Sequence, residues 1–225
     1  MIKNKILCCI LHTEKQPEQY EAIEKTWGSR IDHMYYSDHE DASKNIIKTS
    51  DKSDYKSCVE KNARVFKTLI NDDRYNHYDY YFFVDNDTYV NEPKLRSSIE
   101  KGEFGEDKIY GWTWRDKEGW NWLMGGAGYL MNRKVLKKFE NCEIVNTARY
   151  GDVNVQNHAF HNGVVIEKRA GFNVCGGDPR YKSGDPIDIQ IERLPEPYHE
   201  QFTFHYMKGI DIMMHVQNRL KKEYK

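Results

Sequence analysis

Residues 80–90 read YYFFVDNDTYV, and this stretch decides the fold. Its first five residues, Tyr80–Val84, are all apolar or aromatic, as in a strand covered on both faces of a sheet. The strand runs directly into Asp85, Asn86 and Asp87. In open α/β sheets ligands bind beyond the carboxyl ends of the strands, so two carboxylates stand where a site is expected. Residues 85 and 87 share one side of an extended chain, and both can face one cation.

Outward from this strand, short apolar runs alternate with helical patterns. Strands are expected at Lys5–His12, Asp32–Tyr36, Asn45–Lys48 and Lys108–Trp112, and helices at Pro17–Trp27, from about Asp54 to Ile70, from Pro93, and at Asp152–His161. Phe202–Met207 is expected to be a strand or a core segment, and the basic tail Arg219–Lys225 a frayed helix end. This alternation is typical of β-α-β units and predicts an α/β fold with a mostly parallel sheet.

Composition limits the other possibilities. The 225 residues, 39% hydrophobic and 13% aromatic, suit one domain with one good-sized core. The 34 Lys+Arg and 35 Asp+Glu nearly cancel, which disfavours a nucleic-acid partner without excluding one. The longest apolar run, Ile6–Leu11, is far shorter than the roughly 18 residues of a membrane span. We expect a soluble protein, located in the cytoplasm or, as a trimmed part of a longer chain, in a luminal compartment.

The five cysteines do not have the spacing of a zinc site. Adjacent Cys8 and Cys9 point to opposite faces of a strand. Cys142 and Cys175 could form a disulfide, but scattered reduced thiols are favoured in a chain without a secretion signal.

The carboxylates of Asp85 and Asp87 have a specific chemistry. Hard oxygen ligands suit Mg²⁺ or Mn²⁺, and such an ion can bridge two phosphates. The ordinary alternative for an isolated D-x-D is a solvated turn with Asp as a helix cap. The buried strand that precedes this pair favours the metal site.

The residues around this motif resemble a known family. Phe83–Val90 is similar to the "DDDTYV" block of the Fringe and core-1 β1,3-galactosyltransferase family of GT-A enzymes. Five further blocks follow the family order: Ala22–Gly28 resembles "AIRxTWG", Tyr55 with Cys58 and Lys61 resembles "YxxLxxK", Gly125–Tyr129 resembles "GGAGY", Gly151–Val153 resembles "EDV", and Phe204–Tyr206 resembles "FHY". The chain departs from the family at Glu24 (Arg), Asn86 (Asp), Gly151 (Glu) and Gln156 (Gly).

The resemblance implies a single GT-A (Rossmann-like) domain over residues 1–225, with a mixed, mostly parallel sheet, a donor-binding half of about 1–110 and an acceptor half of about 111–225. It also implies an inverting, metal-dependent glycosyltransferase that moves Gal, GlcNAc or Glc from a UDP-sugar to a hydroxyl, forming a β-linkage such as β1,3. Asp85, Asp87 and His205 would hold Mn²⁺ or Mg²⁺, with Asp87 as the first direct ligand, and Asp152 would be the base. On spacing alone, His205 would be a core histidine and Asp152 a helix N-terminal acid.

Further donor contacts are expected around these residues. Thr13 and Lys61 could touch the diphosphate or uracil, and Asn86 the ribose or a metal-bound water. Gly125 and Gly126 let backbone approach a ligand closely, although a structural turn explains them almost as well. Trp122 belongs to a cluster of aromatic platforms suited to the apolar faces of sugars, or to core packing: Trp112, Trp114, Trp120 and Trp122.

Two other functions remain open from the sequence. Metal-dependent nucleotidyl transfer also uses a D-x-D at a strand end, but Gly28-Ser29 does not form the expected phosphate loop. A non-catalytic sugar-binding domain is conceivable from Asn86 and Gly151. Neither the sugar nor the acceptor is fixed: a protein-linked glycan, a free saccharide, a lipid-linked sugar and a modified nucleobase are all compatible.

Overall fold

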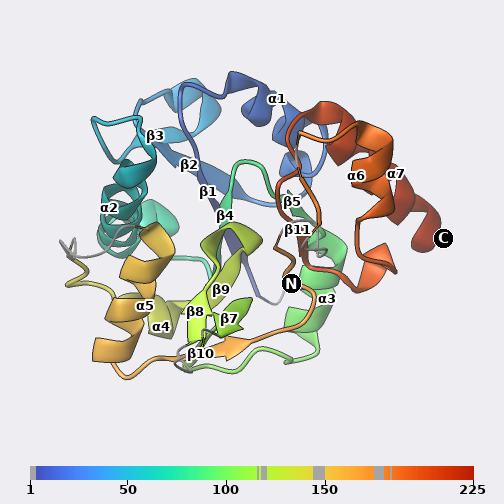
Figure 1. The fold of residues 1–225 in the computed structure, drawn as a ribbon. Helices are drawn as coiled ribbons and strands as arrows, with labels where there is room; N and C mark the ends of the chain where they lie inside the picture. The colour runs from blue at the N-terminus through green and yellow to red at the C-terminus, as the bar shows by residue number, and fades with distance from the viewer. Residues whose placement is uncertain (1–3, 116, 118–120, 144–149, 175–179, 183) are drawn as a thin grey trace.

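A central sheet between two layers of helices organises the chain (Figure 1). The computed structural model describes residues 4–115, 117, 121–143, 150–174, 180–182 and 184–225. Within these residues no helix is both long enough and apolar enough to cross a membrane.

The main sheet has seven strands. In spatial order they are β10 (Val165–Lys168), β6 (Lys108–Gly111), β9 (Tyr129–Asn132), β4 (Tyr80–Asp85), β1 (Ile6–Leu11), β2 (His33–Ser37) and β3 (Ile46–Lys48). Among the described strands only β9 runs antiparallel to its neighbours, β4 and β6. The predicted α/β fold with a mixed, mostly parallel sheet is confirmed.

The central strands β1 and β4 are buried on both faces. Along β1, Ile6, Cys8 and Ile10 pack into one core, whereas Leu7 and Cys9 pack into the other. Strand β4 alternates in the same way. Burying one such large side chain contributes about 1.5–3 kcal/mol. This two-sided burial is why residues 80–84 form an uninterrupted apolar run and why β4 carries its acidic end to the middle of one sheet edge.

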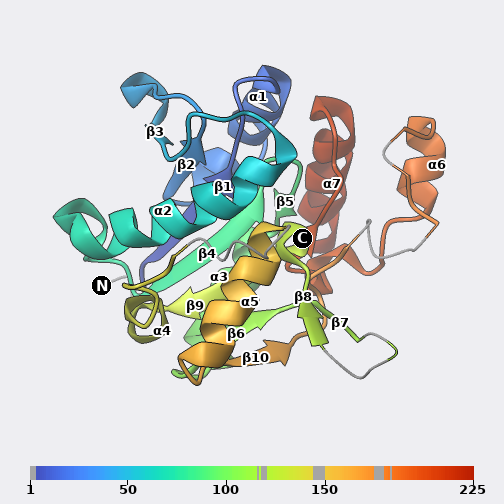
Figure 2. The ribbon, with the colours of Figure 1, turned by 60° about the vertical axis from the view of Figure 1, so that its left-hand side comes forward.

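Helices cover both faces of the sheet (Figure 2). One face carries α2 (Cys58–Asn71), α4 (Arg133–Lys137) and α5 (Gly151–His161), and the other carries α1 (Pro17–Lys25), α3 (Glu92–Glu100) and α7 (Ile210–Glu223), with α6 (Ile187–Glu192) beside α7. Side chains fix several helix starts: Asn132 accepts a hydrogen bond from Val135 N at the start of α4, and Asp54 caps the 3-10 turn Tyr55–Ser57 that leads into α2.

Two small two-stranded sheets lie beside the carboxyl end of β4. Strand β5 (Tyr89–Val90) pairs with β11 (Thr203–Phe204), and β7 (Thr113–Arg115) pairs with β8 (Asn121–Leu123). The expected element at 202–207 is therefore a two-residue strand followed by irregular chain. Because β11 lies against β5, the chain after Phe204 reaches the acidic end of β4.

The cysteine and tryptophan expectations have separate outcomes. Cys142 is a buried free thiol, and Cys175 lies outside the described residues. Trp112 and Trp122 are half-buried, Trp114 is exposed, and Trp120 also lies outside the described part.

Candidate active site

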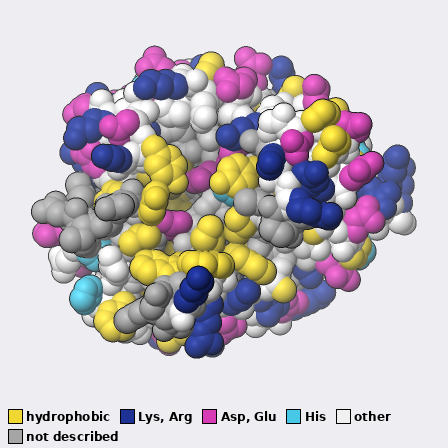
Figure 3. All heavy atoms as spheres, viewed as in Figure 1, with side chains coloured by type: hydrophobic (Ala, Val, Ile, Leu, Met, Phe, Trp, Pro, Cys, Tyr) yellow, Lys and Arg dark blue, Asp and Glu magenta, His cyan; other side chains and the backbone are white. Residues whose placement is uncertain are grey.

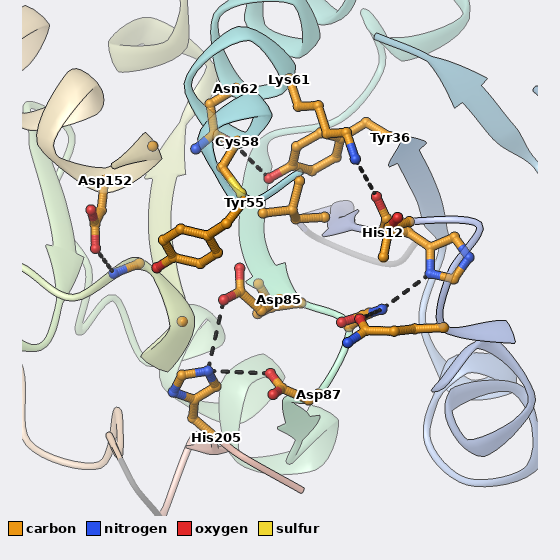
Figure 4. A pocket seen from close by; sticks show the side chains of 18 of the residues that line it. His12, Tyr36, Tyr55, Cys58, Lys61, Asn62, Asp85, Asp87, Asp152 and His205 are labelled. Carbon is orange, nitrogen blue, oxygen red and sulfur yellow. Dashed lines mark hydrogen bonds and ion pairs between the residues drawn. The ribbon is translucent and has the colours of Figure 1, made fainter. Parts of the chain in front are cut away.

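The carboxyl ends of β1, β2 and β4 open onto a cavity of about 450 Å³. Its walls come from the loop after β1, the start of α2, the residues after β4, the Gly125–Gly126 turn, the start of α5 and the segment after β11. Figure 4 looks into this cavity. All of the predicted site residues except Trp122 line it: Thr13, Lys61, Asp85, Asn86, Asp87, Gly125, Gly126, Asp152 and His205.

Two carboxylates and an imidazole meet at one end of the cavity (Figure 4). His205 Nε2 lies 3.2 Å from Asp87 Oδ1 and 3.7 Å from Asp85 Oδ2. One ligand atom from each of the three residues lies within 4.8 Å of the others. Ligands of one divalent ion at 2.0–2.3 Å have roughly this mutual separation. The side chain of His205 is only 9% exposed, whereas that of Asp85 is 38% exposed toward the cavity.

The electrostatics of this cluster favour a cation. The pKa of Asp85 is raised to about 7, mainly by loss of water and also by the charges of Asp87 and Asp152, against the opposing effect of His205. The pKa of His205 is raised: burial lowers it, but hydrogen bonding to Asp87 and the charges of both carboxylates outweigh that effect. The negative charges of Asp85 and Asp87 repel each other, and a bound divalent cation would offset this repulsion. The two carboxylates suit Mn²⁺ or Mg²⁺, and the imidazole favours Mn²⁺ of the two.

His205 is held between two neighbours. On one side its ring stacks on Tyr206 at 4.0 Å between centroids. On the other side lies Gly126, where an added Cβ would come 2.2 Å from the imidazole ring. The absence of a side chain at Gly126 therefore makes room for the imidazole.

The chain after His205 is also tied to the loop after β4. Tyr206 has a positive φ of 65°, a strained conformation for a non-glycine residue. Met207 N then donates a hydrogen bond to Asp87 O at 2.7 Å.

We expect Gly126→Ala to weaken Mn²⁺ binding by about 10- to 100-fold, because the new methyl group must push His205 away from Asp85 and Asp87. Calorimetric titration with Mn²⁺ measures this. Gly184→Ala is the matched control, since its Cβ would meet nothing within 4 Å. Equal Mn²⁺ affinity in the two variants would remove His205 from the metal site.

Asp152 lies on the wall away from His205, in the first turn of α5 (Figure 4). Its two oxygens accept separate hydrogen bonds, from Gly125 N at 3.0 Å and from Val153 N at 2.9 Å. A Cβ at Gly125 would come 2.9 Å from the Asp152 Cβ, so this glycine permits the contact. Burial raises the pKa of Asp152 despite these hydrogen bonds. A carboxylate with a raised pKa in a cavity is suited to accept a proton.

Lys61 and Thr13 are engaged with protein groups. The ammonium of buried Lys61 donates to His12 O at 3.0 Å and lies 3.5 Å from Asp38 Oδ1. Thr13 Oγ1 donates to Asp38 Oδ2 at 3.0 Å, and Glu14 N donates to the other oxygen. The pKa of Asp38 is lowered: burial acts against this, but hydrogen bonds from Ser37, Glu14 and Thr13 dominate. These contacts fix the loop after β1 along the cavity.

Asn86 donates both amide hydrogens to protein acceptors. Its Nδ2 lies 3.2 Å from His12 Nδ1 and 3.0 Å from Gln16 Oε1. Desolvation lowers the pKa of His12 to about 4, so this imidazole is neutral and its Nδ1 can accept. A carboxylate at position 86 would face two acceptors. The local partners thus account for asparagine here.

We expect Asn86→Asp to raise the pKa of His12 by about 1 or more, because the new carboxylate favours the protonated imidazole. Histidine NMR titration measures this shift. The signal of His215, on α7 and remote from Asn86, is the internal reference. A His12 signal that titrates as in the unmodified protein would contradict the assigned contact.

Trp122 lines a second cavity beside the first. This cavity, of about 480 Å³, shares Tyr55, Met124 and Asp152 with the first. Trp122 is therefore placed near Asp152 rather than with the Asp85, Asp87 and His205 cluster.

Several lining residues were not identified as site residues from the sequence. They are His12, Lys15, Gln16, Tyr36, Tyr55, Asn62, Tyr206 and Lys208. The rule that points to Asp85 would have found His12, which directly follows β1. Lys208 and Tyr206 could not be found this way, because their position depends on the pairing of β11 with β5.

Comparison with known proteins agrees with this geometry. A model of the family described as Fringe-like matches residues 3–217. The chain belongs to the Fringe-like family. It is thus a glycosyltransferase with the GT-A fold, and the recognition made from the six sequence blocks is confirmed.

Two solved structures that are similar to this chain are distant from it in sequence. A glycosyltransferase involved in the glycosylation of the major capsid of PBCV-1 is 13% identical, with a TM-score of 0.51 over 94% of this chain and 99% of that one. CMP:2-keto-3-deoxy-manno-octonic acid synthetase, complexed with CTP, is 10% identical, with a TM-score of 0.43 over 84% of this chain and 97% of that one.

The other departures from the Fringe-like sequence pattern also have local partners. Glu24 accepts hydrogen bonds from the Tyr35 hydroxyl and pairs with His33, each at 2.7 Å. At Gly151 an added Cβ would lie 2.3 Å from Asn62 Nδ2. Gln156 accepts from Leu123 N at 2.7 Å, which ties α5 to β8. Each residue that differs from the family pattern therefore has a local contact that accounts for it.

Proposed function

We propose that the protein is an inverting, divalent-metal-dependent glycosyltransferase that moves a hexose from a UDP-sugar to an acceptor hydroxyl. Gal, GlcNAc and Glc are the candidate sugars, and a β-linkage such as β1,3 is the expected product. The observation that carries the proposal is the cluster of Asp85, Asp87 and His205 at one end of a cavity that also contains Asp152.

The proposed metal ligands are Asp87 and His205, with Asp85 as a direct or water-mediated third. A bound Mn²⁺ or Mg²⁺ would neutralise charge that develops on the departing diphosphate. His205 and the two carboxylates would hold that ion. The protein supplies further positive charge, because Lys15 and Lys208 both line the cavity. The loop held by Asp38 and Lys61 would border the nucleoside, with Thr13 and Asn86 as positioning residues.

Asp152 is the proposed base. In the reaction, the acceptor oxygen forms a bond to the anomeric carbon while the bond from that carbon to the UDP oxygen breaks. The electron pair of the broken bond stays on the β-phosphate, and the acceptor proton passes to the Asp152 carboxylate. Hydrogen bonds from Gly125 N and Val153 N fix the orientation of that carboxylate.

The two halves of the chain would divide these roles. We assign the donor side mainly to residues 1–110, and the acceptor side to residues 111–225 within the same domain. The second cavity supports this division, because every described residue that lines it except Tyr55 comes from the later half.

We expect UDP release from at least one UDP-sugar in the presence of Mn²⁺, and loss of this release in EDTA. Slow transfer of the sugar to water would give the signal without an acceptor. A coupled UDP assay over UDP-Gal, UDP-GlcNAc and UDP-Glc measures it, with restoration by excess Mn²⁺ as the control. Turnover that persists in chelator would contradict metal dependence.

A further inference from the structure

Four aromatic side chains surround the second cavity, which lies beside Asp152. They are Tyr55, Trp114, Trp122 and Tyr150. Three of them are exposed: Tyr55 is 72%, Trp114 is 56% and Tyr150 is 48% exposed. Hydrophobic side chains gather across the middle of this face of the molecule, around a hollow in which acidic side chains are visible (Figure 3). Exposed aromatic groups that converge on one cavity indicate a binding site.

These aromatic groups form two walls. Trp114 and Trp122 are direct partners in the β7–β8 ladder, so their side chains stand next to each other on one face of the hairpin. Tyr55 and Tyr150 form an edge-to-face pair with centroids 5.9 Å apart. One wall thus comes from the hairpin, and the other from the chain segments that precede α2 and α5.

The second cavity opens onto the proposed reaction centre. Tyr55, Met124 and Asp152 line both cavities. In Figure 4 the Tyr55 ring lies between Asp152 and Asp85. A molecule in the second cavity therefore lies on the Asp152 side, while the metal cluster lies on the other.

The charges of the two cavities differ. Among the described residues that line the second cavity, Asp152 is the only charged one. The first cavity has Lys15, Lys61 and Lys208 in its lining. A phosphate or a carboxylate in the second cavity would meet an anionic side chain without a lysine or arginine among these lining residues to offset it. The described lining of the second cavity therefore disfavours an anionic occupant.

We infer that the second cavity binds one neutral pyranose of the acceptor, with the C–H face of the ring on Trp114 and Trp122 and a hydroxyl directed at Asp152. This inference rests on the proposed function. A pyranose combines an apolar face with hydroxyls at its edge, which matches aromatic walls next to one carboxylate. The volume of about 480 Å³ suits a small saccharide. Acidic sugars, sugar phosphates and nucleic acid do not match this lining.

Direct binding tests the inference without turnover. Saturation-transfer NMR is recorded with UDP and diamagnetic Mg²⁺ present, on methyl glycosides of glucose, galactose, mannose, fucose and xylose, and on methyl glucuronide and glucose 6-phosphate. We expect signals for at least one neutral glycoside, strongest for protons on one ring face, and none for the two anions. Binding of the anions alone, or of none of the sugars, would overturn the inference.

A variant pair locates the binding. Trp114→Ala should raise the dissociation constant of the neutral glycoside about tenfold. Trp114→Phe keeps an aromatic ring and should retain part of the affinity. Phe160→Ala is the control, because Phe160 is an exposed aromatic residue of α5 that lines neither cavity. Equal affinity of the glycoside for Trp114→Ala and Phe160→Ala would place the sugar elsewhere.

Acceptor-independent UDP release separates the two proposals. If UDP release depends on Mn²⁺ but the neutral glycosides do not bind, the proposed function stands and the inference about the second cavity fails. If no UDP-sugar is turned over while a neutral glycoside still binds at Trp114, the proposed function fails and the sugar site stands.

Discussion

Asp87→Ala is expected to lower Mn²⁺-dependent UDP release by at least about 10³-fold, the effect of losing several kcal/mol of charge stabilisation. Asp87 Oδ1 is the carboxylate oxygen nearest to His205 Nε2, at 3.2 Å, and Asp85 Oδ2 is more distant. Removal of the Asp87 carboxylate leaves a site with one carboxylate, that of Asp85, and one imidazole. Coupled UDP release and calorimetric titration with Mn²⁺ measure the two effects.

The control for this variant is Asp188→Ala. Asp188 is an exposed acid on α6 that lines neither cavity, so its removal should leave Mn²⁺ binding intact. Circular dichroism of both variants checks the fold. Asp87→Ala protein that is folded and still turns over donor with Mn²⁺ would remove Asp87 from the metal site.

The location of the acidic end of β4 could be predicted because it depends on local sequence. Residues 80–84 are apolar without alternation, and both faces of β4 are buried. The carboxylates follow the strand without a gap. Neighbouring strands of the parallel part were predicted for the same reason, since each is a short apolar run between helical patterns.

Other elements depend on long-range pairing. Strand β9 has four residues, and its position between β4 and β6 comes from those two neighbours rather than from any period of its own. Strand β10 lies at the sheet edge, and none of its residues is buried. Its sequence therefore lacks the continuous apolar run that predicts a central strand. Helix α7 is different, because Ile212, Met213, Val216 and Leu220 have helical spacing and are buried. This spacing is readable in the sequence, where only a helix end at 219–225 was predicted.

The glycine-rich turn has a more specific role than the sequence indicated. Backbone approach to a ligand was expected at Gly125 and Gly126. In the structure, the space at Gly125 and at Gly126 also admits the side chains of Asp152 and His205. Such contacts involve residues far apart in the chain, and their need for glycine becomes visible only when the fold brings them together.

The polar contacts of Lys61 and Asn86 were also beyond local sequence. Both side chains line the cavity, yet their assigned hydrogen bonds go to the loop after β1. A sequence pattern can place a polar residue at a strand end or on a helix. It does not specify whether that residue contacts a substrate or holds a neighbouring loop, because the partners lie on other elements.

Asp152→Asn is expected to lower transfer by about 10²–10⁴-fold while UDP binding with Mn²⁺ is retained. The amide cannot accept the proton of the acceptor hydroxyl at neutral pH. An asparagine has one acceptor oxygen where Asp152 uses two, toward Gly125 N and Val153 N, so some reorientation is expected. Transfer rate at saturating donor, together with calorimetric binding of UDP, separates loss of the base from loss of the site.

The pH dependence gives an independent test of the same residue. Burial raises the pKa of Asp152, and a base must be ionised to act, so transfer should fall as the pH decreases through this raised pKa. The fall should occur at higher pH than for an ordinary aspartate. In Asp152→Asn the residual transfer should lose this limb of the profile. A variant that binds UDP weakly, or keeps the same acidic limb, would require another residue as the base. Asp85 is then the candidate, because it lines the same cavity and its pKa is also raised.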